Sequence, residues 1–370
     1  MSPVIDGLGA GRSSGELAVE RALGEVRAGR GVVIEADSAA IVAFPAEAFG
    51  DRTAEGLEAA GAAETRLVLP APRLLKMGAP RAQAGAIALQ PLDPARVARL
   101  ALRADASVDG PVTPADPLEA TALELLALAL LLPAAVVCVL PEAAVADLLH
   151  VAASDVRAYR AAQAARLAIV ARAPVPLEGA PDSEFVVFRG GEGLRDQVAI
   201  IVGRPDLSRP VAVRLHSACL TGDLFGSLKC DCGDQLRDTV RRMAEGEGGI
   251  LLYLDQEGRG TGISNKMRAY ALQAQGYDTY DADAALGFEL DQRRFDFAAA
   301  MLRQLGVSAV RIFTNNPQKI AALKVAGLAV VADQRVHGRP TAENVRYLAS
   351  KRDRAGHYID FDALAARAPD

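Results

Sequence analysis

The stretch CLTGDLFGSLKCDC, Cys219–Cys232, holds three of the four cysteines in the chain. The preceding segment, VAVRLHS, predicts a strand, and the following segment, DQLRDTVRRMAEGEGG, predicts a helix with apolar Leu236, Val240 and Met243. ILLYL then predicts another strand. Since strands and helices alternate here, we expect the cysteines to lie in an α/β layer.

The chain of 370 residues is long enough for two domains of ordinary size. We expect one domain over residues 1–160 and a second over residues 161–370, joined near the predicted helix VAASDVRAYRAAQAARL. Helix and strand signals alternate in both. The expected fold class is therefore α/β (α+β), with two domains that are each a mixed sheet packed with helices.

Several segments define individual elements. SSGELAVERALGEVRAGR predicts a capped amphipathic helix, and GVVIEADSAAIVAF predicts two short strands. FVVFRGGEGLRDQVAIIVG predicts a hairpin that turns at Gly190–Gly191. Ser264 is expected to cap the helix SNKMRAYALQAQG, and Asp291 stands just before the predicted helix QRRFDFAAAMLRQLG. AVRIF and NPQKIAALKVAG predict a strand and then a helix.

Composition and charge exclude some functions. A net charge of −5 argues against a bulk affinity for nucleic acid or an anionic membrane, although a local cationic pocket for a phosphorylated ligand is compatible with it. The absence of tryptophan argues against base-stacking platforms for single strands. The early GLGAGRSSG lacks the strand and the Gly-Lys-Ser/Thr that a phosphate-binding loop needs.

No segment at the start of the chain has the apolar core of a signal peptide. The apolar run Leu125–Leu140 is short for a membrane span and is divided by Pro133, so we expect a buried helix followed by a buried strand. With few cysteines in addition, the sequence predicts a cytoplasmic protein with no membrane partner.

The spacing of Cys219, Cys230 and Cys232 points to a metal. A disulfide between Cys230 and Cys232 would be strained, because a single residue separates them. Three thiols without an evident fourth protein ligand are typical of a catalytic zinc, which keeps a water in the remaining position and lowers the pKa of that water to about 7. The alternative is three unrelated buried thiols.

Polar neighbours of the cysteines make the alternative of unrelated buried thiols the weaker one. Asp223, Lys229 and Asp231 lie within or beside the cysteine segment, where an apolar core would exclude them. His216 precedes Cys219 by three residues. From spacing alone it is equally well a fourth ligand, a proton shuttle or a residue at the end of a strand.

Five ordered motifs resemble those of GTP cyclohydrolase II, the first committed enzyme of riboflavin synthesis: RLHSACLTGD with SLKCDCG, then QEGRG, NKMRAYALQAQGYDT, LGFELDQR and TNNPQK. The resemblance runs from about Arg166 to His357. It implies an enzyme that opens the imidazole ring of GTP and releases formate and pyrophosphate. It also implies a homodimer with one Zn²⁺ per subunit, held by three cysteines and a water, and Mg²⁺ on the triphosphate.

The resemblance assigns roles to catalytic residues. Asp291 matches the general base, Arg293 a residue with a nucleophilic role at the α-phosphate, and Tyr270 a residue at the zinc site. Because a guanidinium stays protonated, Arg293 could instead clamp phosphate charge. From the residues alone, Asp291 could equally be a helix cap, and Tyr270 a core residue at helical spacing from Met267.

The resemblance also implies a set of substrate contacts: Arg214, Leu215, His216, Ser217, Ala218, Gln235, Glu257, Gly258, Arg259, Thr279, Thr314 and Lys319. The cationic members suit a triphosphate, and the helix start at Asn316–Pro317 supplies backbone amides. Glu257 suits the two adjacent donors of guanine. Alternatively, Lys319 and Lys324 form a solvated helix face, and Thr279 lies in a strand.

Three departures from the family pattern leave the base specificity open. Ala218 stands where the family usually has Glu, Gly260–Gly262 reads GTG, and DQRVHGRPTAEN replaces the usual Val-Pro-Leu region. Two alternatives to a GTP cyclohydrolase II therefore stay open. One is a paralogue that acts on UTP, and the other is a catalytically decayed nucleotide-binding protein.

The first domain weakly resembles dihydroxybutanone-phosphate synthase. That family carries an acidic metal-binding run where this chain has EADSAAIVAFPAE, in which most of the acids are missing. The resemblance therefore implies a degenerate, non-catalytic domain with a structural role.

Overall fold

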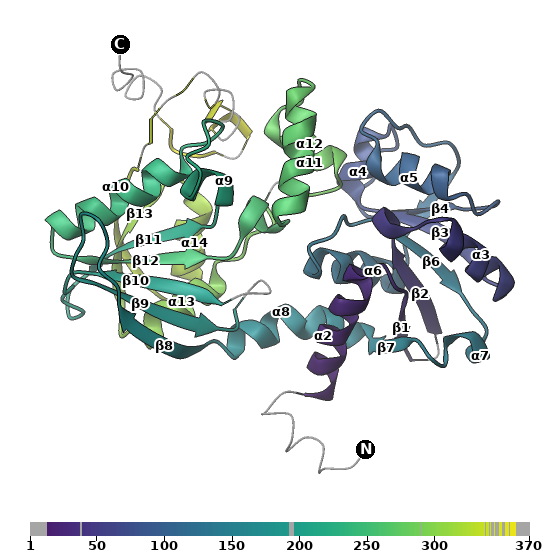
Figure 1. The fold of residues 1–370 in the computed structure, drawn as a ribbon, viewed down its shortest axis with the longest axis horizontal. Coiled ribbons are helices and arrows are strands. Elements are labelled where there is room, and N and C mark those ends of the chain that lie inside the picture. The colour runs from purple at the N-terminus through teal and green to yellow at the C-terminus, as the bar shows by residue number, and fades with distance from the viewer. Residues whose placement is uncertain are drawn as a thin grey trace. The chain divides into compact units, whose positions relative to one another are not determined.

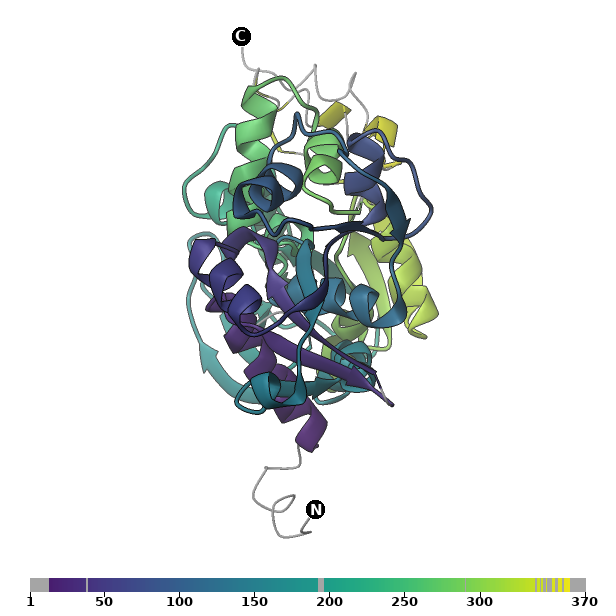
Figure 2. The same ribbon diagram turned by 90° about the vertical axis from the view of Figure 1, so that its right-hand side faces the viewer.

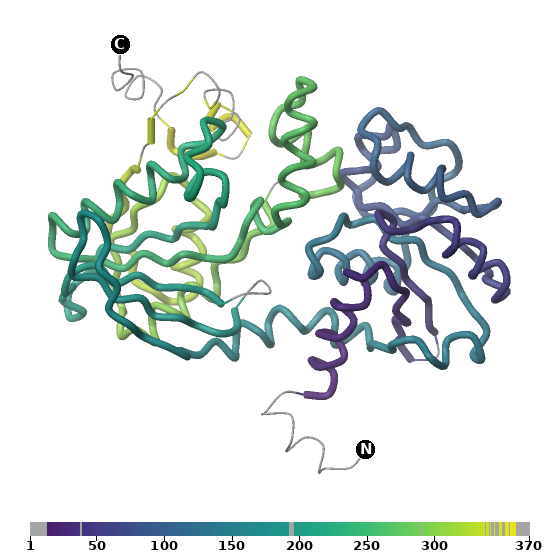
Figure 3. The backbone as a smooth tube through the Cα atoms, in the orientation of Figure 1, coloured from purple at the N-terminus to yellow at the C-terminus, as the bar shows by residue number. Residues whose placement is uncertain are grey.

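The computed structural model describes residues 13–37, 39–191, 196–289, 291–336, 338–339, 341, 344, 348–349, 352–354 and 356–359. The chain forms two units. The first comprises Met1–Ala162, Ser264–Tyr277 and Asp281–Leu290, and the second comprises Gln163–Ile263, Asp278–Tyr280 and Asp291–Asp370. The chain passes from the first unit to the second along helix α8, Ala153–Ala165 (Figure 3).

The first unit is built on a seven-stranded sheet with the order β5-β4-β3-β6-β2-β1-β7 (Figure 2). Its strands are β1 Val32–Ala36, β2 Ala39–Pro45, β3 Ala63–Leu69, β4 Gly85–Ala88, β5 Val112–Pro114, β6 Ala135–Val139 and β7 Leu149–Ala152. The sheet is mixed, because β1 pairs with β7 in parallel and with β2 in antiparallel orientation.

Helices cover both faces of this sheet (Figure 1). One face packs against α2 Ser14–Arg27, α6 Pro117–Leu128 and α8; the other packs against α3 Asp51–Ala59, α4 Ala71–Lys76 and α5 Pro94–Leu102. The short elements η1 Ala46–Ala48 and α7 Glu142–Val145 complete the unit's N-terminal part. Neighbouring strand residues point to opposite faces, so Ile34 lies in one core and Val33 in the other.

The second unit has a seven-stranded sheet with the order β14-β13-β11-β12-β10-β9-β8. Its strands are β8 Ala168–Pro174, β9 Ser183–Arg189, β10 Gln197–Val202, β11 Val211–Ser217, β12 Gly249–Leu254, β13 Ala309–Phe313 and β14 Ala329–Gln334. β11 is parallel to β12 and β13, whereas β10 is antiparallel to β12. The expected α/β class with two mixed sheets is therefore confirmed.

Two layers of helices also flank the second sheet (Figure 1). Helix α10, Cys232–Glu245, packs on one face, and α13 Asp296–Gln304 and α14 Pro317–Val325 pack on the other. The remaining elements are α9 Leu220–Asp223, η2 Glu257–Gly260, α11 Ile263–Ala274 and α12 Thr279–Ala285. Because β11, β12 and β13 are parallel, the loops that follow them emerge at the same edge of the sheet.

Most predicted elements are confirmed. Ser13 and Glu16 form the capping box at the start of α2. The apolar run forms α6 and β6 on either side of Pro133. The predicted hairpin is formed by β9 and β10, with positive φ at Gly190 and Gly191, while residues 192–195 lie outside the described part. The GLGAG segment of the glycine-rich start also lies outside it.

One local prediction, for Ser264, and two alternatives, for Asp291 and Thr279, are wrong. Helix α11 begins at Ile263, so Ser264 lies inside its first turn and does not cap it. Helix α13 begins only at Asp296, which excludes Asp291 as its cap. Thr279 begins a helix, α12, and is not a strand residue.

None of the helices in the described part of the chain has the length and apolarity that a membrane crossing needs.

Phe297 on α13 is 1% exposed in the core of the second unit. We expect Phe297→Ala to lower the free energy of unfolding by about 3–5 kcal/mol, because the ring leaves a cavity. Urea unfolding followed by circular dichroism measures this in a chain without tryptophan. Phe225, which is 74% exposed, is the matched control, and Phe225→Ala should change stability by about 0.5 kcal/mol or less. Equal losses in the two variants would contradict the assignment of Phe297 to the core.

Candidate active site

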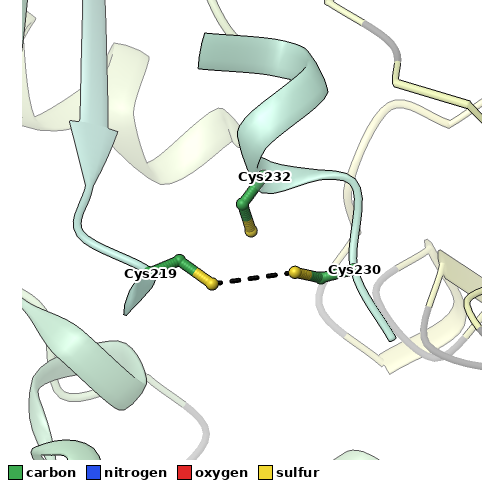
Figure 4. A group of neighbouring side chains, drawn as sticks. All are labelled: Cys219, Cys230 and Cys232. Atoms are coloured by element: carbon green, nitrogen blue, oxygen red, sulfur yellow. Dashed lines mark hydrogen bonds between the residues drawn. The ribbon is translucent and has the colours of Figure 1, made fainter. Parts of the chain in front are cut away.

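The three cysteines of the opening stretch come together in the second unit. Cys219 follows the end of β11, Cys230 ends the next loop, and Cys232 is the first residue of α10. Their sulfur atoms lie within 4.8 Å of one another, and those of Cys219 and Cys230 are 3.6 Å apart. Figure 4 shows the three side chains pointing toward a common centre. Among the described residues, no other cluster of three His, Cys, Asp or Glu side chains offers a metal site.

Two glycines make this close approach possible. A Cβ on Gly222 would lie 2.7 Å from the sulfur of Cys230 and 3.0 Å from that of Cys219. A Cβ on Gly233 would lie 2.2 Å from the carbonyl oxygen of Gly222. The thiols therefore pack over bare backbone, and α9 approaches the start of α10 at a distance that no side chain allows.

The electrostatics of the thiols fit a cation. The hydrogen bond with the Cys219 thiol and burial together raise the pKa of Cys230 to about 11. The two neighbouring thiols and burial also raise the pKa of Cys232. Three thiolates this close would repel one another, and a divalent metal that prefers sulfur removes the repulsion and displaces the protons. The cysteine cluster is thus compatible with zinc.

Asp223 holds the first cysteine in place. Its carboxylate accepts hydrogen bonds from the backbone amide of Cys219 at 2.9 Å and from the hydroxyl of Tyr253 at 3.0 Å. Nε2 of His216 lies 3.0 and 3.1 Å from the two carboxylate oxygens. The His216 ring also stacks on the Tyr253 ring, with centroids 5.6 Å apart. One carboxylate therefore fixes the backbone that carries Cys219.

This contact assigns His216. Burial lowers its pKa, so the ring is neutral near pH 7, and a proton on Nε2 completes the bond to Asp223. Nε2 is thus directed to the carboxylate, and the ring is not a member of the metal cluster. Of the three roles left open by spacing, that of a metal ligand does not fit. Asp223 also raises the pKa of Tyr253, after burial, which keeps the hydroxyl a donor.

A second buried network reaches the other two cysteines. The guanidinium of Arg214 donates to the carbonyl of Phe313 at 3.0 Å and to Oε1 of Gln235 at 2.5 Å. The amide of Gln235 donates in turn to Asp231, which lies between Cys230 and Cys232. Burial lowers the pKa of Arg214 to about 10, so it remains a cation at neutral pH. Two predicted substrate contacts, Arg214 and Gln235, are thus part of the support of the cysteine loop.

Lys319 is not on a solvated face. Its side chain is 5% exposed, and Nζ donates to the carbonyl of Leu215 at 2.6 Å and lies 5.2 Å from the centre of the Phe295 ring. Lys324, five residues further along the chain, is exposed. The alternative of a shared solvated face for these two lysines is therefore wrong for Lys319, whose charge lies at the sheet edge.

Side chains next to the start of α14 accept hydrogen bonds from its first backbone amides. Asn316 caps the amide of Gln318 at 2.9 Å, and the hydroxyl of Thr314 accepts from the amide of Asn316 at 3.0 Å. The amides of Asn316 and Gln318 in this predicted phosphate site thus already have partners within the chain.

Asp291 and Arg293 form a closed pair. The carboxylate of Asp291 accepts from the backbone amide of Arg293 at 3.0 Å, from Nε at 2.8 Å and from Nη2 at 2.6 Å. Burial raises the pKa of Asp291, but the bonds and charge of Arg293 outweigh it and hold the pKa below its usual value. Nη1 of Arg293 also lies 3.4 Å from the hydroxyl of Ser217, at the end of β11.

The loop after β12 has an unusual backbone. Gly258, Arg259, Gly260 and Gly262 have φ values of 63°, 62°, 90° and 87°. For Arg259 this left-handed conformation is strained, and such strain is concentrated at functional sites. Its guanidinium lies over the ring of Tyr280, 4.9 Å from the centre. The carboxylate of Glu257 accepts from the amides of Leu220 at 2.6 Å and Gly258, which ties this loop to α9.

The structure brings most predicted site residues to one edge of the second sheet. They come from β11 and the loops after β11, β12 and β13, together with the Asp291–Arg293 pair. The amide of Ala218 donates to the carbonyl of Leu254 at 2.8 Å, and Thr279 is buried at the start of α12. Tyr270 lies on α11, which groups with the first unit, so its place at the zinc site stays a prediction.

The sequence pattern does not reveal two members of the site, Tyr253 and Gly222. The register of the parallel strands provides the missing signal for Tyr253, because it pairs with His216 on the next strand. For Gly222 the signal exists only in three dimensions, where two sulfur atoms occupy the space of its side chain.

The chain resembles known proteins over this region. A family model described as GTP cyclohydrolase II matches residues 168–335. GTP cyclohydrolase-2 of Xylella fastidiosa is 52% identical over 255 residues, which are 68% of this chain and 64% of that protein. The match thus spans just under two thirds of that relative's length. It also covers more residues than follow Ala162, so the likeness reaches into the first unit.

A solved two-domain 3,4-dihydroxy-2-butanone 4-phosphate synthase from A. baumannii aligns over 86% of this chain and 99% of that chain. Its identity of 16% and TM-score of 0.33 are too low to support any conclusion about the first unit.

This chain matches a larger share of a second relative. GTP cyclohydrolase-2 of Actinobacillus succinogenes is 47% identical over 176 residues, which are 48% of this chain and 81% of that protein. The resemblance inferred from the motifs is confirmed by these matches. The chain belongs to the GTP cyclohydrolase II family.

Proposed function

We propose that this chain is a zinc-dependent GTP cyclohydrolase II that hydrolyses GTP to formate, pyrophosphate and a diamino-ribosylamino-pyrimidinone phosphate in riboflavin biosynthesis. The observation that carries the proposal is the three-thiol cluster that follows β11, the strand that Lys319 contacts at Leu215 and Arg293 at Ser217. A homodimer, as the family resemblance implies, and a cytoplasmic location, as the sequence predicts, complete the proposal.

Cys219, Cys230 and Cys232 would hold the zinc, which when bound supplies Lewis-acid activation of a water at neutral pH. Asp223 keeps the backbone of Cys219 in position, while Arg214 and Gln235 support the loop of the other two ligands. The rigid thiol arrangement therefore depends on two buried polar networks, one for each side of the cluster.

The triphosphate requires fixed cations. Arg259 and Arg293 present planar guanidinium groups that suit phosphate oxygens, and Lys319 adds a compact charge. Mg²⁺ would join them on the triphosphate, held in part by the substrate itself. Since a guanidinium keeps its proton, we assign Arg293 to clamping phosphate charge and not to nucleophilic attack.

Asp291 is a weak base while Arg293 holds it. A phosphate that draws the Arg293 guanidinium away would remove the bonds that lower the pKa of Asp291. Burial would then raise that pKa toward the range in which a carboxylate accepts a proton efficiently. Substrate binding and activation of the base are thereby coupled through one arginine.

The function is tested by incubating the zinc-loaded protein with Mg²⁺ and GTP, and separately with UTP. We expect formate and pyrophosphate from GTP in equal amounts and neither from UTP. Ala218, which departs from the family pattern next to Cys219, is the reason for the UTP arm. Turnover of UTP alone would transfer the proposal to the paralogue, and binding of GTP without products would indicate a decayed enzyme.

Asp223→Asn tests the support of the metal ligands. Loss of the charge that holds the Cys219 amide should weaken zinc binding by about 10–100-fold in competition with a chelator. Cys230→Ser gives the reference for a lost ligand. Asp238→Asn is the control, because Asp238 pairs with Arg241 and Arg242 on the surface of α10. Undiminished affinity in Asp223→Asn would remove Asp223 from the metal site.

Arg293→Gln tests the coupling to Asp291. Without the guanidinium, burial dominates and the pKa of Asp291 rises. Since a base acts only when deprotonated, its activity is lost as the pH falls through its pKa. The acid limb of kcat/KM for GTP should therefore move to higher pH in the weakly active variant. Arg294→Gln, which loses only the pair with Asp296, should keep the wild-type limb. A limb that stays in place in both variants would contradict the role of Asp291.

A further inference from the structure

Helices α11 and α12 lie within the region matched by the GTP cyclohydrolase II family, yet residues 264–277 and 281–290 pack in the first unit. Their apolar side chains form a buried cluster with Leu132, which precedes β6 of the first sheet. The members from the later segments are Ala269, Ala282, Leu286 and Phe288. Leu132 thus joins the apolar cluster that α11 and α12 form with each other.

Arg73 on α4 anchors the end of α12. It is 1% exposed, and in the described structure all its hydrogen bonds go to backbone carbonyls. Two reach Leu100, at 3.1 and 2.6 Å, and one reaches Arg103 at 2.7 Å, at the end of α5. The fourth reaches Ala285, the last residue of α12, at 2.6 Å.

The surroundings explain how a cation is tolerated there. Helix carboxyl ends carry partial negative charge, and Arg73 lies between the ends of α5 and α12. Burial lowers its pKa to about 10, so the guanidinium is charged at neutral pH. Removing it would leave the carbonyls at two helix ends without their donors, which is costly in a buried site.

Further polar contacts fix α11. Glu47 of η1 accepts from the guanidinium of Arg268 at 3.1 and 3.3 Å and from the amide of Leu132 at 2.8 Å. The side chain of Asn265 donates to the carbonyl of Leu130 at 3.1 Å. Both helices are therefore held by specific hydrogen bonds as well as by apolar packing.

We propose that the first unit holds α11 and α12 in the position that the cyclohydrolase reaction needs, and that Arg73 is a positioning residue for this reaction. The inference rests on the proposed function. α11 carries Tyr270, α12 begins with Thr279 and with Tyr280, which packs under Arg259, and Asp291 follows directly after Leu290. Arg73 touches none of the reacting groups and acts through the helix that it holds.

The test uses the full zinc-loaded chain and compares Arg73→Lys with the wild type. Lysine keeps the charge, but a single ammonium cannot reach both helix ends as a guanidinium does. We expect kcat per bound zinc to fall by about tenfold or more, because small displacements of reacting groups are costly. Zinc content should stay unchanged, and hydrogen exchange should rise in residues 279–289.

Arg96→Met is the matched control. Arg96 donates to Asp109 and to the carbonyl of Ala88 in the same unit, away from α11 and α12. Its loss should leave kcat per bound zinc unchanged. An Arg73→Lys enzyme with wild-type kcat and wild-type exchange would overturn the proposal.

Glu47 and Arg268 provide a second test should Arg73 variants fold poorly. We expect Glu47→Gln and Arg268→Gln each to lower kcat per bound zinc. The kcat of the double variant should be no lower than that of the less active single variant. Additive effects of the two substitutions, or no effect, would contradict the proposal that Glu47 and Arg268 together hold α11 in place. If the wild type releases no formate, the proposed function fails, and the exchange rates of residues 279–289 still decide whether Arg73 holds α12.

Discussion

Three sulfur atoms within 4.8 Å of one another impose the constraint on which the site depends. Three thiolates would repel one another, and a thiol is not a metal ligand until it loses its proton. A bound cation resolves both, because it displaces the protons and neutralises the thiolate charge. The chain meets this constraint by placing glycines where side chains would prevent the close approach. Gly222 leaves room for the sulfur atoms of Cys219 and Cys230, and Gly233 lets α10 start against the backbone of Gly222. Asp223 and Asp231 fix the two segments from which the sulfur atoms project.

The parallel strands explain why the rest of the site is found there. β11 and β12 run in register from Val213 and Ile250 to Ser217 and Leu254, so the cysteine loop and the loop with Arg259 leave the sheet side by side. The alternation along β11 sends Val213 and Leu215 into the core under α13 and α14, and Arg214 and His216 toward α10. One strand therefore serves the core with one face and the metal site with the other.

The sequence predicted much of this because three of the four cysteines stand within fourteen residues and have polar neighbours. The three cysteines, the strand before them and the helix after them could be identified from composition and periodicity. Periodicity could not predict that Arg214 and Lys319 are buried, because their partners are carbonyls of Phe313 and Leu215 in other strands. It also could not predict that Asp291 binds Arg293 in place of capping a helix, since the start of α13 depends on tertiary packing.

Helix α12 begins among residues of the second unit and ends on Arg73 of the first. This has a consequence for how such a chain changes over time. A unit that only carries its own chemistry can be discarded once that chemistry is not needed. On the proposed role, a substitution at Arg73, Glu47 or the core around Leu132 disturbs α11 and α12 even when it touches no reacting group, so these positions are constrained by the reaction as well as by the fold of their own unit.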